Sequence, residues 1–252
     1  MLGSILSDFR PLTGPFHPKF WIVPQVFTAV RFFDDIAYAV TFEQRDPFYV
    51  VNLEDPENPT ILGELDVSGF SSYLHPINQD KTMILAVGQE ADNDGNILGL
   101  QITLFDATDP VNPVDIDRFV VEKDKKQYST SSVEWDERAF RYLSLGDNRG
   151  RVIIPMTINS WNDSGNNFDG FAVYAVENNK ISHAFDISHT DPQTLTATCY
   201  CGWLPERSFV FNGDVMTLKG HTVLSTDLDS GDREWTLTVD VDGAGVGGCC
   251  HW

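Results

Sequence analysis

Residues 49–65 read YVVNLEDPENPTILGEL and residues 103–119 read TLFDATDPVNPVDIDRF, so the chain repeats a strand, a polar turn and a second strand. Both copies carry the motif D-P-x-N-P in the turn. The residue before a proline is held extended, proline presets φ for a turn, and asparagine tolerates tight backbone geometry. The motif therefore predicts a chain reversal between two antiparallel strands and indicates no chemistry.

Strand patterns fill most of the remaining chain, and no convincing run shows the helical spacing of apolar residues. Two hairpins are marked by their turns. Asn212 and Gly213 accept the positive φ of a type I′ turn, so they predict a hairpin. Asp34 and Asp35 give a weaker signal for a hairpin of the same kind. Continuous apolar runs predict strands buried on both faces, and alternating runs predict further strands. The continuous runs are residues 82–87 and 151–156, and the alternating runs are residues 36–42, 100–105 and 171–176.

Two weaker copies of the repeat follow, at residues 171–187 and 223–239. The chain thus holds about four units of about 45–70 residues, each with three or four strands, which is typical of β-propeller blades. A two-sheet sandwich would not explain this spacing. We predict an all-β, antiparallel, propeller-like fold with about four blades, complete or partial, over residues 31–240. An N-terminal segment of residues 1–30 precedes it, and a Gly- and Cys-rich tail of residues 241–252 follows.

The composition excludes several classes of protein. The 252 residues carry a formal net charge of −20, so a nucleic acid is a poor partner. No stretch reaches the ~18 apolar residues of a membrane span. The acidic surface indicates either solubility in saline surroundings or a concentration of cations near the surface. The four cysteines lack the usual spacing of a zinc site and leave packed thiols and disulfides open. They are Cys199, Cys201, Cys249 and Cys250.

The best candidate for a metal site is the loop E-A-D-N-D-G-N at residues 90–96. Asp92, Asp94 and Asn96 occupy alternate positions, which lets their oxygens point into one small space, and Glu90 could add a carboxylate. Hard oxygen ligands of this kind suit Ca²⁺, although the loop lacks the final glutamate of an EF-hand. The other interpretation is a polar hairpin loop without metal.

Two other features give weaker indications. Asp163, Asn166 and Asp169 lie in a second acidic loop at looser spacing and are a less convincing cation site. His75, in Y-L-H-P, has no clear partner nearby in the sequence, which favours a structural role over catalysis. Carboxylate pairs are expected by chance among 37 acidic residues, so none of them identifies a glycosidase.

Several segments resemble the secreted β-propeller domain family of bacteria and archaea. The resemblance covers residues 30–240, and the D-P-x-N-P turn is also similar to that of cell-surface propellers with an L-V-I-V-D core. It implies a location outside the cytoplasm or at the cell surface, and it implies no reaction. The matching segments are VTFEQRDPFYVVNLEDP at 40–56, LGEL at 62–65, GFSSYLHP at 69–76, LFD at 104–106 before DP at 109–110, and RSF at 207–209.

The sequence departs from this family in two places. The family usually shows a histidine within the segment that aligns with residues 135–140, where this chain has Glu137. The family also usually has a long propeller region before the part that matches Ala29. Blades are therefore missing, or the propeller is small, or another chain, for instance a second copy in a homo-oligomer, completes the ring.

Because propellers bind through the loops at the ends of their central channel, we expect a binding or interaction module. Its partner would be an extracellular protein or a glycan that the sequence does not identify, and calcium could stabilise it. The alternative is an extracellular hydrolase with its site in the central channel. Such an enzyme would gather several carboxylates with His or Arg in one channel mouth.

Overall fold

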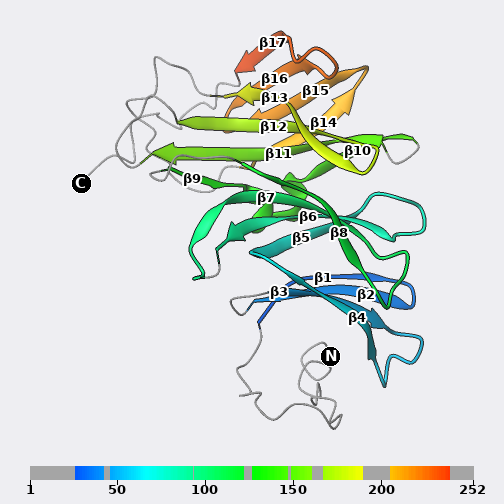
Figure 1. Cartoon of the computed structure of the whole chain (residues 1–252). Coiled ribbons are helices and arrows are strands. Elements are labelled where there is room, and N and C mark those ends of the chain that lie inside the picture. The colour runs from blue at the N-terminus through cyan, green and yellow to red at the C-terminus, as the bar shows by residue number, and fades with distance from the viewer. Residues whose placement is uncertain are drawn as a thin grey trace.

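The computed structural model describes residues 26–42, 46–92, 94–121, 127–146, 149–160, 167–189 and 205–238. Within these residues the chain forms β-strands and two single-turn 3₁₀ helices, with no α-helix. The strands make four antiparallel sheets that follow one another along the chain and stack face to face (Figure 1). The all-β, propeller-like prediction with four units is confirmed, and the described sheets do not close into a ring (Figure 1).

Each sheet is a meander in which neighbouring strands pair in sequence order. The first sheet contains β1 (Val26–Phe33), β2 (Ile36–Phe42), β3 (Asp46–Asn52) and β4 (Thr60–Val67). The second contains β5 (Phe70–Pro76), β6 (Met83–Ala91), β7 (Ile97–Asp106) and β8 (Val114–Val120). The third contains β10 (Arg141–Gly146), β11 (Arg149–Ser160), β12 (Phe168–Glu177) and β13 (Lys180–Ser188), with β9 (Gln127–Thr130) paired to β11. The fourth contains β14 (Arg207–Phe211), β15 (Asp214–Lys219), β16 (Thr222–Asp227) and β17 (Arg233–Thr238).

Successive sheets are stacked in the same orientation. At one edge of the stack β1 contacts β5, and β10 contacts β14. At the other edge β4 contacts β8, and β8 contacts β13. We call the edge formed by the first strands β1, β5, β10 and β14 the inner edge. The 3₁₀ turns η1 (Ser132–Glu134) and η2 (Glu137–Ala139) precede β10, and η1 contacts β5.

The core consists of three apolar layers, each between two consecutive sheets. In the layer between the first and second sheets, the rings of Tyr38, Phe48 and Phe105 stack with centroids 5.5 and 4.5 Å apart. Tyr174 is completely buried in the next layer and Phe171 in the last. β6 and β11 are buried on both faces because each lies in a sheet covered on both sides. The two continuous apolar runs are therefore strands of the predicted kind.

The D-P-x-N-P turns are built identically in both copies. Asp55 Oδ1 accepts a hydrogen bond from the backbone N of Glu57 at 3.1 Å, and its Oδ2 accepts one from Nδ2 of Asn58 at 2.8 Å. Asp109 makes the corresponding two bonds at 3.1 and 2.8 Å. The motif joins β3 to β4 and β7 to β8, so the prediction of a turn between antiparallel strands is confirmed.

Positive backbone φ angles mark the predicted hairpins. Asn212 and Gly213, between β14 and β15, have φ of 53° and 92°, and Asp34, between β1 and β2, has φ of 48°. The two weaker copies of the repeat are the pairs β12–β13 and β16–β17. Residues 1–25 and 239–252, which hold most of the predicted N-terminal segment and the whole tail, lie outside the described residues.

Candidate functional site

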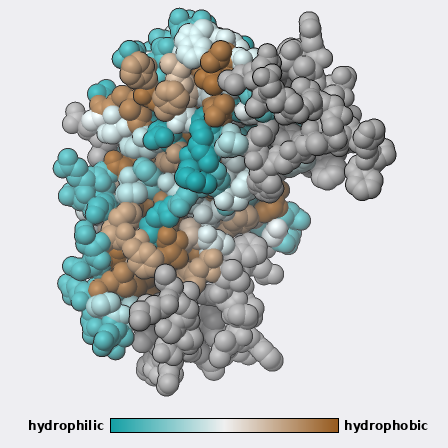
Figure 2. All heavy atoms as spheres, turned by 180° about the vertical axis from the view of Figure 1, so that it is seen from behind, coloured by the Kyte–Doolittle hydropathy of each residue, from teal (hydrophilic) through white to brown (hydrophobic). Residues whose placement is uncertain are grey.

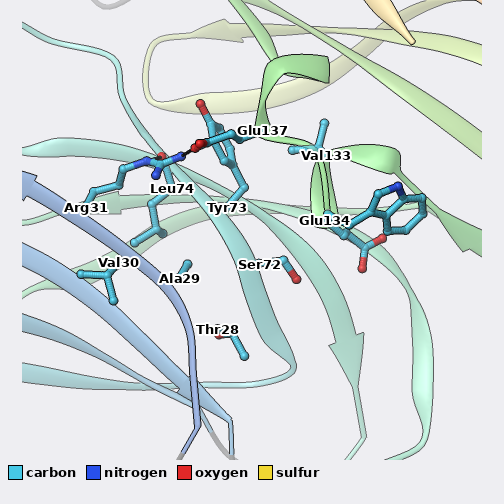
Figure 3. Close-up of a pocket in the computed structure, with 11 residues that line it drawn as sticks. Thr28, Ala29, Val30, Arg31, Ser72, Tyr73, Leu74, Val133, Glu134 and Glu137 are labelled. Atoms are coloured by element: carbon cyan, nitrogen blue, oxygen red, sulfur yellow. Dashed lines mark hydrogen bonds and ion pairs between the residues drawn. The ribbon is translucent and has the colours of Figure 1, made fainter. Parts of the chain in front are cut away.

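An open pocket of about 260 Å³ lies at the inner edge, where the first three sheets approach one another (Figure 3). Residues 28–31 of β1 form one wall, residues 72–74 of β5 form the next, and the segment with η1 and η2 forms the third. The lining residues are Thr28, Ala29, Val30, Arg31, Ser72, Tyr73, Leu74, Val133, Glu134, Trp135 and Glu137.

Three contacts fix Arg31 in the pocket. Its Nε donates to the carbonyl oxygen of Leu74 at 3.0 Å, its Cζ lies 4.7 Å from the centre of the Tyr73 ring, and its Nη2 pairs with Oε2 of Glu137. The side chain of Arg31 is 30% exposed and that of Glu137 is 63% exposed. A solvated ion pair contributes only about 0–1 kcal/mol to stability. The pair between Arg31 and Glu137 can therefore open, and each side chain can then bind a polar group of a ligand.

Glu134 is held more firmly. Its Oε1 accepts hydrogen bonds from the backbone N of Ser131 at 3.0 Å and from Nε2 of Gln89 at 2.8 Å. Ser131 and Glu134 form a capping box around η1, which ties the carboxylate to the local turn. Burial raises the pKa of Glu134, although both hydrogen bonds act in the opposite direction.

An aromatic cluster stands beside the pocket. The Tyr73 hydroxyl lies 3.2 Å from Nδ1 of His75, whose ring centroid is 4.8 Å from that of Phe140 and 5.8 Å from that of Tyr142. Burial, together with the charges of two nearby arginines, lowers the pKa of His75 to about 4. His75 is therefore neutral at pH 7 and packed among rings, which agrees with the structural role favoured from the sequence.

The pocket combines three kinds of recognition group. Trp135 is 55% exposed and offers an aromatic surface. The Arg31–Glu137 pair offers a donor and an acceptor, and Ser72 adds a hydroxyl (Figure 3). Such a set suits a ligand that has an apolar face to stack on a ring and polar groups around its edge.

The predicted calcium ligands take part in two separate networks. Asp92 Oδ1 accepts hydrogen bonds from the backbone N of Asp94 at 3.0 Å and of Asn96 at 2.8 Å, and its Oδ2 accepts one from Nδ2 of Asn96 at 3.0 Å. The side-chain bond from Asn96, followed by the backbone bond from the same residue, lowers the pKa of Asp92. The carboxylate of Asp92 thus organises its own hairpin loop.

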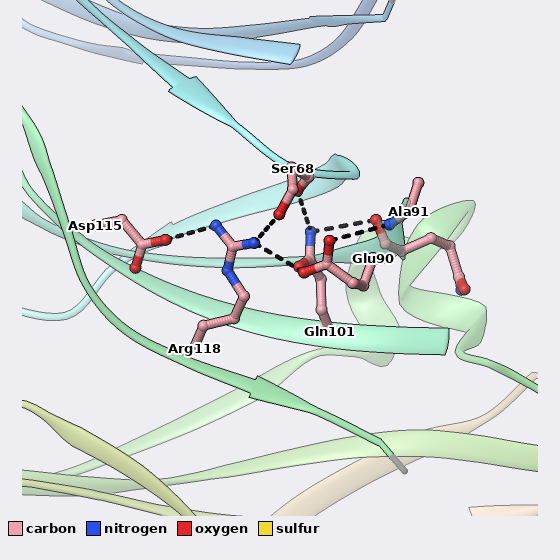
Figure 4. Close-up of polar contacts among 7 residues, drawn as sticks. Ser68, Glu90, Ala91, Gln101, Asp115 and Arg118 are labelled. Carbon is pink, nitrogen blue, oxygen red and sulfur yellow. Dashed lines mark hydrogen bonds and ion pairs between the residues drawn. The ribbon is translucent and has the colours of Figure 1, made fainter. Parts of the chain in front are cut away.

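Glu90 belongs to an ion-pair network that crosses the second sheet (Figure 4). Arg118 Nη1 lies 2.8 Å from Oε2 of Glu90 and also donates to Oγ of Ser68, while its Nη2 lies 2.5 Å from Oδ2 of Asp115. In the described parts of the chain no three or more His, Cys, Asp or Glu side chains are grouped so that they could hold a metal ion. The calcium site at Glu90, Asp92, Asp94 and Asn96 stays a prediction.

Of the three candidate ligands in the second acidic loop, the structure describes Asp169, whereas Asp163 and Asn166 lie outside the described residues. Its Oδ1 lies 2.6 Å from Nζ of Lys219, which also pairs with Glu206. The side chain of Lys219 is only 6% exposed. Burial acts to lower the pKa of Lys219, but the two carboxylates outweigh it and raise that pKa. Cys199, Cys201, Cys249 and Cys250 also lie outside the described residues.

Sequence reasoning missed most of the pocket. Arg31 and Tyr73 come from two different sheets, and Glu134 and Trp135 come from the segment with η1 and η2, so no local motif joins them. One signal was present: Glu137 stands where the resembling family usually has a histidine, and it does line the pocket. The S-x-x-E pattern of residues 131–134 indicates a capped turn but not a pocket.

Two curated relatives are similar to parts of this chain. An uncharacterized protein of Archaeoglobus fulgidus is 45% identical over 95 residues, which are 38% of this chain and 14% of that protein. An uncharacterized protein of Methanocaldococcus jannaschii is 34% identical over 163 residues, which are 64% of this chain and 22% of that protein. The chain therefore spans less than a quarter of the length of these relatives.

Solved structures with a similar arrangement include two bacterial proteins. A Lactobacillus plantarum protein matches with a TM-score of 0.47 and 14% identity, covering 85% of this chain and 56% of its own. AztD of Citrobacter koseri matches with a TM-score of 0.42 and 12% identity, and the match covers 85% of this chain and 47% of AztD. None of the described residues forms a helix with the length and hydropathy needed to cross a bilayer. A family model described as a beta propeller domain matches residues 25–231, and the chain belongs to this family.

Proposed function

We propose that the chain is a binding module and that its ligand occupies the pocket at the inner edge. The observation that supports this is that Arg31 of β1 and the η1–η2 segment with Trp135 and Glu137 meet at one open pocket. A fold of this kind carries its function in such sites rather than in its framework. The pocket is slightly smaller than the ~300–1,000 Å³ of common ligand sites, so it suits one unit of a longer ligand.

A neutral glycan fits this pocket better than a charged polymer. The exposed face of Trp135 matches the apolar face of a sugar ring, and Arg31 with Glu137 matches its hydroxyl groups. A net charge of −20 repels polyanions. We therefore propose an oligosaccharide of neutral sugars as the ligand class, with an extracellular protein as the other candidate.

Calorimetric titration with hexamers of N-acetylglucosamine and of glucose tests this proposal. Binding to either hexamer should weaken about 5- to 30-fold in Trp135→Ala, since an aromatic anchor contributes about 1–2 kcal/mol. Tyr128→Ala removes an exposed aromatic ring outside the pocket and serves as the matched control. Absence of binding to both hexamers, or equal binding by the wild type and Trp135→Ala, would contradict the glycan assignment.

A hydrolase is the second candidate, because the pocket gathers two glutamates with an arginine. Burial raises the pKa of Glu134, which suits a general acid, and Glu137 lines the same pocket as a second carboxylate. Mass spectrometry of the two hexamers after long incubation separates the two functions. Cleavage that is lost in Glu134→Gln would identify an enzyme, and intact hexamers would leave a binding module.

We also propose that the protein acts outside the cytoplasm, at the cell surface or in the medium. The resemblance to the secreted propeller family supports this location, and the acidic composition agrees with it. Fractionation of the native host with an antibody to the chain provides the test. Recovery in the cytoplasmic fraction alone would contradict the proposal.

Stabilisation by calcium remains a further proposal. A Ca²⁺ ion at residues 90–96 would compete with the hydrogen bonds that Asp92 accepts and with the ion pair of Glu90. By linkage, calcium at 100 times its Kd would add about 2.7 kcal/mol to the stability of the folded state. A rise of Tm in CaCl₂ over EDTA that disappears in Asp92→Ala would support the site, and an unchanged Tm would remove it.

A further inference from the structure

Lys219 is buried with two carboxylates between the third and fourth sheets. Charged side chains normally stay at the surface, and Figure 2 shows hydrophilic residues spread over the face of the molecule that it draws. The other two lysines in the described ranges, Lys81 and Lys180, are 40% and 80% exposed. The side chain of Lys219 is 6% exposed, and those of its partners Asp169 and Glu206 are 25% and 15% exposed. We call Asp169, Glu206 and Lys219 the buried triad.

The strand pattern directs Asp169 and Lys219 into the same layer. Asp169 lies two residues before Phe171 in β12, and Lys219 lies four residues after Val215 in β15. Because side chains alternate along a strand, each of them shares a face with that buried residue. Phe171 and Val215 both belong to the apolar layer between the third and fourth sheets. The stacking of the two sheets therefore holds the amine of Lys219 against the carboxyl of Asp169, largely away from water.

The contacts within the buried triad suit a reaction between these two groups. Nζ of Lys219 lies 2.6 Å from Oδ1 of Asp169 and also pairs with Oε1 of Glu206. Oγ1 of Thr157, on the neighbouring strand β11, donates to the same Oδ1 of Asp169 at 2.9 Å. The amine thus touches the carboxyl that it can attack, and a second carboxylate touches the amine. These groups match the nucleophile, the general base and the oxyanion donor that acyl transfer requires.

We propose that Lys219 and Asp169 condense to an amide, so that a covalent cross-link joins β12 of the third sheet to β15 of the fourth. Glu206 moves the protons, since it touches the amine. It passes one proton from the ammonium group of Lys219 to Oδ2 of Asp169, and the neutral Nζ then attacks Cγ. It passes a second proton from the nitrogen to Oδ2, the bond between Cγ and Oδ2 breaks, and water leaves.

The atoms and electrons of this step balance within the buried triad. An ammonium group and a carboxylate become one amide and one water, and Oδ1 of Asp169 remains as the amide carbonyl oxygen. Glu206 ends in the protonation state in which it began, and nothing is oxidised or reduced. The reaction therefore needs no co-reactant. This modification is independent of the ligand pocket.

Confinement and burial favour the amide over the ion pair. Burial acts to lower the pKa of Lys219 and the two carboxylates raise it further, so the neutral amine is the minor form and condensation is slow. Confinement offsets this, since groups held in contact react as if at an effective concentration of about 10⁵–10⁸ M. The product is favoured because a neutral amide avoids the cost of holding an ion pair away from water.

The intact mass of the purified chain, measured after prolonged incubation, reduction and denaturation, tests the proposal. The wild type should weigh about 18 Da less than its sequence mass, which is the mass of one water. Fragmentation of the tryptic peptides should place the bond between Asp169 and Lys219. Lys219→Arg and Asp169→Ala should keep the full sequence mass, because each lacks one of the two reacting groups. Lys180→Arg, the matched control at a lysine 3.9 Å from Asp117, should still lose one water.

The ion pair and the amide both tie β12 to β15 through Lys219, so mass rather than stability distinguishes them. Glu206→Gln should slow the loss of water by about 10²–10⁴-fold, the usual contribution of general acid–base catalysis. Circular dichroism shows whether each variant is folded. A wild type that keeps its full sequence mass would overturn the proposal. So would a loss of water that persists in folded Lys219→Arg, because that water would come from another part of the chain.

Discussion

Single side chains organise the turns that join the strands. Asp55 and Asp109 each accept one backbone and one asparagine hydrogen bond within D-P-x-N-P. The bond from the asparagine side chain, followed by the backbone bond, lowers the pKa of each carboxyl. The ionised carboxylate is therefore the form that the folded turn prefers.

Replacing Asp55 should destabilise the protein in a pH-dependent way. The pKa of the Asp55 carboxyl is lower in the folded state than in the unfolded state, where it is about 3.9. The carboxylate therefore stabilises the folded state at pH values above about 3.9, and this contribution is lost as the pH falls through the folded pKa. Asp55→Ala should lower Tm more than Asp55→Asn at pH 7, and both differences should shrink towards pH 3. Differential scanning fluorimetry measures this. Glu57→Ala is the control in the same turn, and a pH-independent difference would contradict the explanation.

Replacing Glu134 should have the opposite effect. The pKa of the Glu134 carboxyl is higher in the folded state than in the unfolded state. Such a group lowers the stability of the folded state as the pH rises from the unfolded pKa through the folded pKa. Glu134→Gln keeps an oxygen that can accept from Ser131 and Gln89 and carries no charge. Its Tm should exceed that of the wild type at pH 7, with the difference vanishing below about pH 4. A lower Tm at pH 7 would show that the charge itself is needed.

At the scale of the elements, the sheets approach one another closely at glycines. A side-chain carbon on Gly63 of β4 would collide with the backbone oxygens of Pro110 and Val111 in the second D-P-x-N-P turn. Gly63 is thus required where β4 meets the turn between β7 and β8, since the colliding atoms are backbone and cannot rotate away.

Gly63→Ala should therefore lower the free energy of unfolding by about 1–3 kcal/mol, the usual cost of overpacking. Chemical denaturation with urea measures this value. Glu64→Ala, at the exposed neighbour in the same strand, should change it by less than about 0.5 kcal/mol. Equal effects of the two substitutions would contradict the close contact.

The third and fourth sheets are joined by a buried charge. Lys219→Met would leave Asp169 and Glu206 without their cation, and breaking a buried pair in this way costs about 3–5 kcal/mol. Lys180→Met removes a lysine that is 80% exposed and lies 3.9 Å from Asp117, so it should cost less than about 1 kcal/mol. Urea denaturation measures the free energy of unfolding of both variants. A similar loss of stability in Lys219→Met and Lys180→Met would contradict the importance of burial.

Local chemistry explains what could be predicted from the sequence. The alternation of apolar and polar residues, the D-P-x-N-P motif and the Asn-Gly pair each determine the backbone over a few residues. The strands, the turns and the four units were therefore predictable. The pocket was not, because Arg31, Tyr73 and Glu134 meet only after three sheets have stacked. The ion pair of Glu90 was not predictable for the same reason, because its partner Arg118 lies in another strand, 28 residues later.

At the scale of the whole molecule, four stacked sheets produce two different kinds of surface. The inner edge carries polar groups around a pocket, and the first and last sheets expose individual large apolar side chains. The first kind of surface suits a ligand.

Hydrogen–deuterium exchange with and without the bound hexamer of N-acetylglucosamine or glucose tests the central claim most directly, because it locates the ligand along the chain. The account predicts slower exchange at residues 28–31, 72–74 and 133–137, which line the pocket, and unchanged exchange at residues 90–99 and 209–211. Protection that is absent from the pocket segments, or that appears at residues 90–99 or 209–211 instead, would contradict the account.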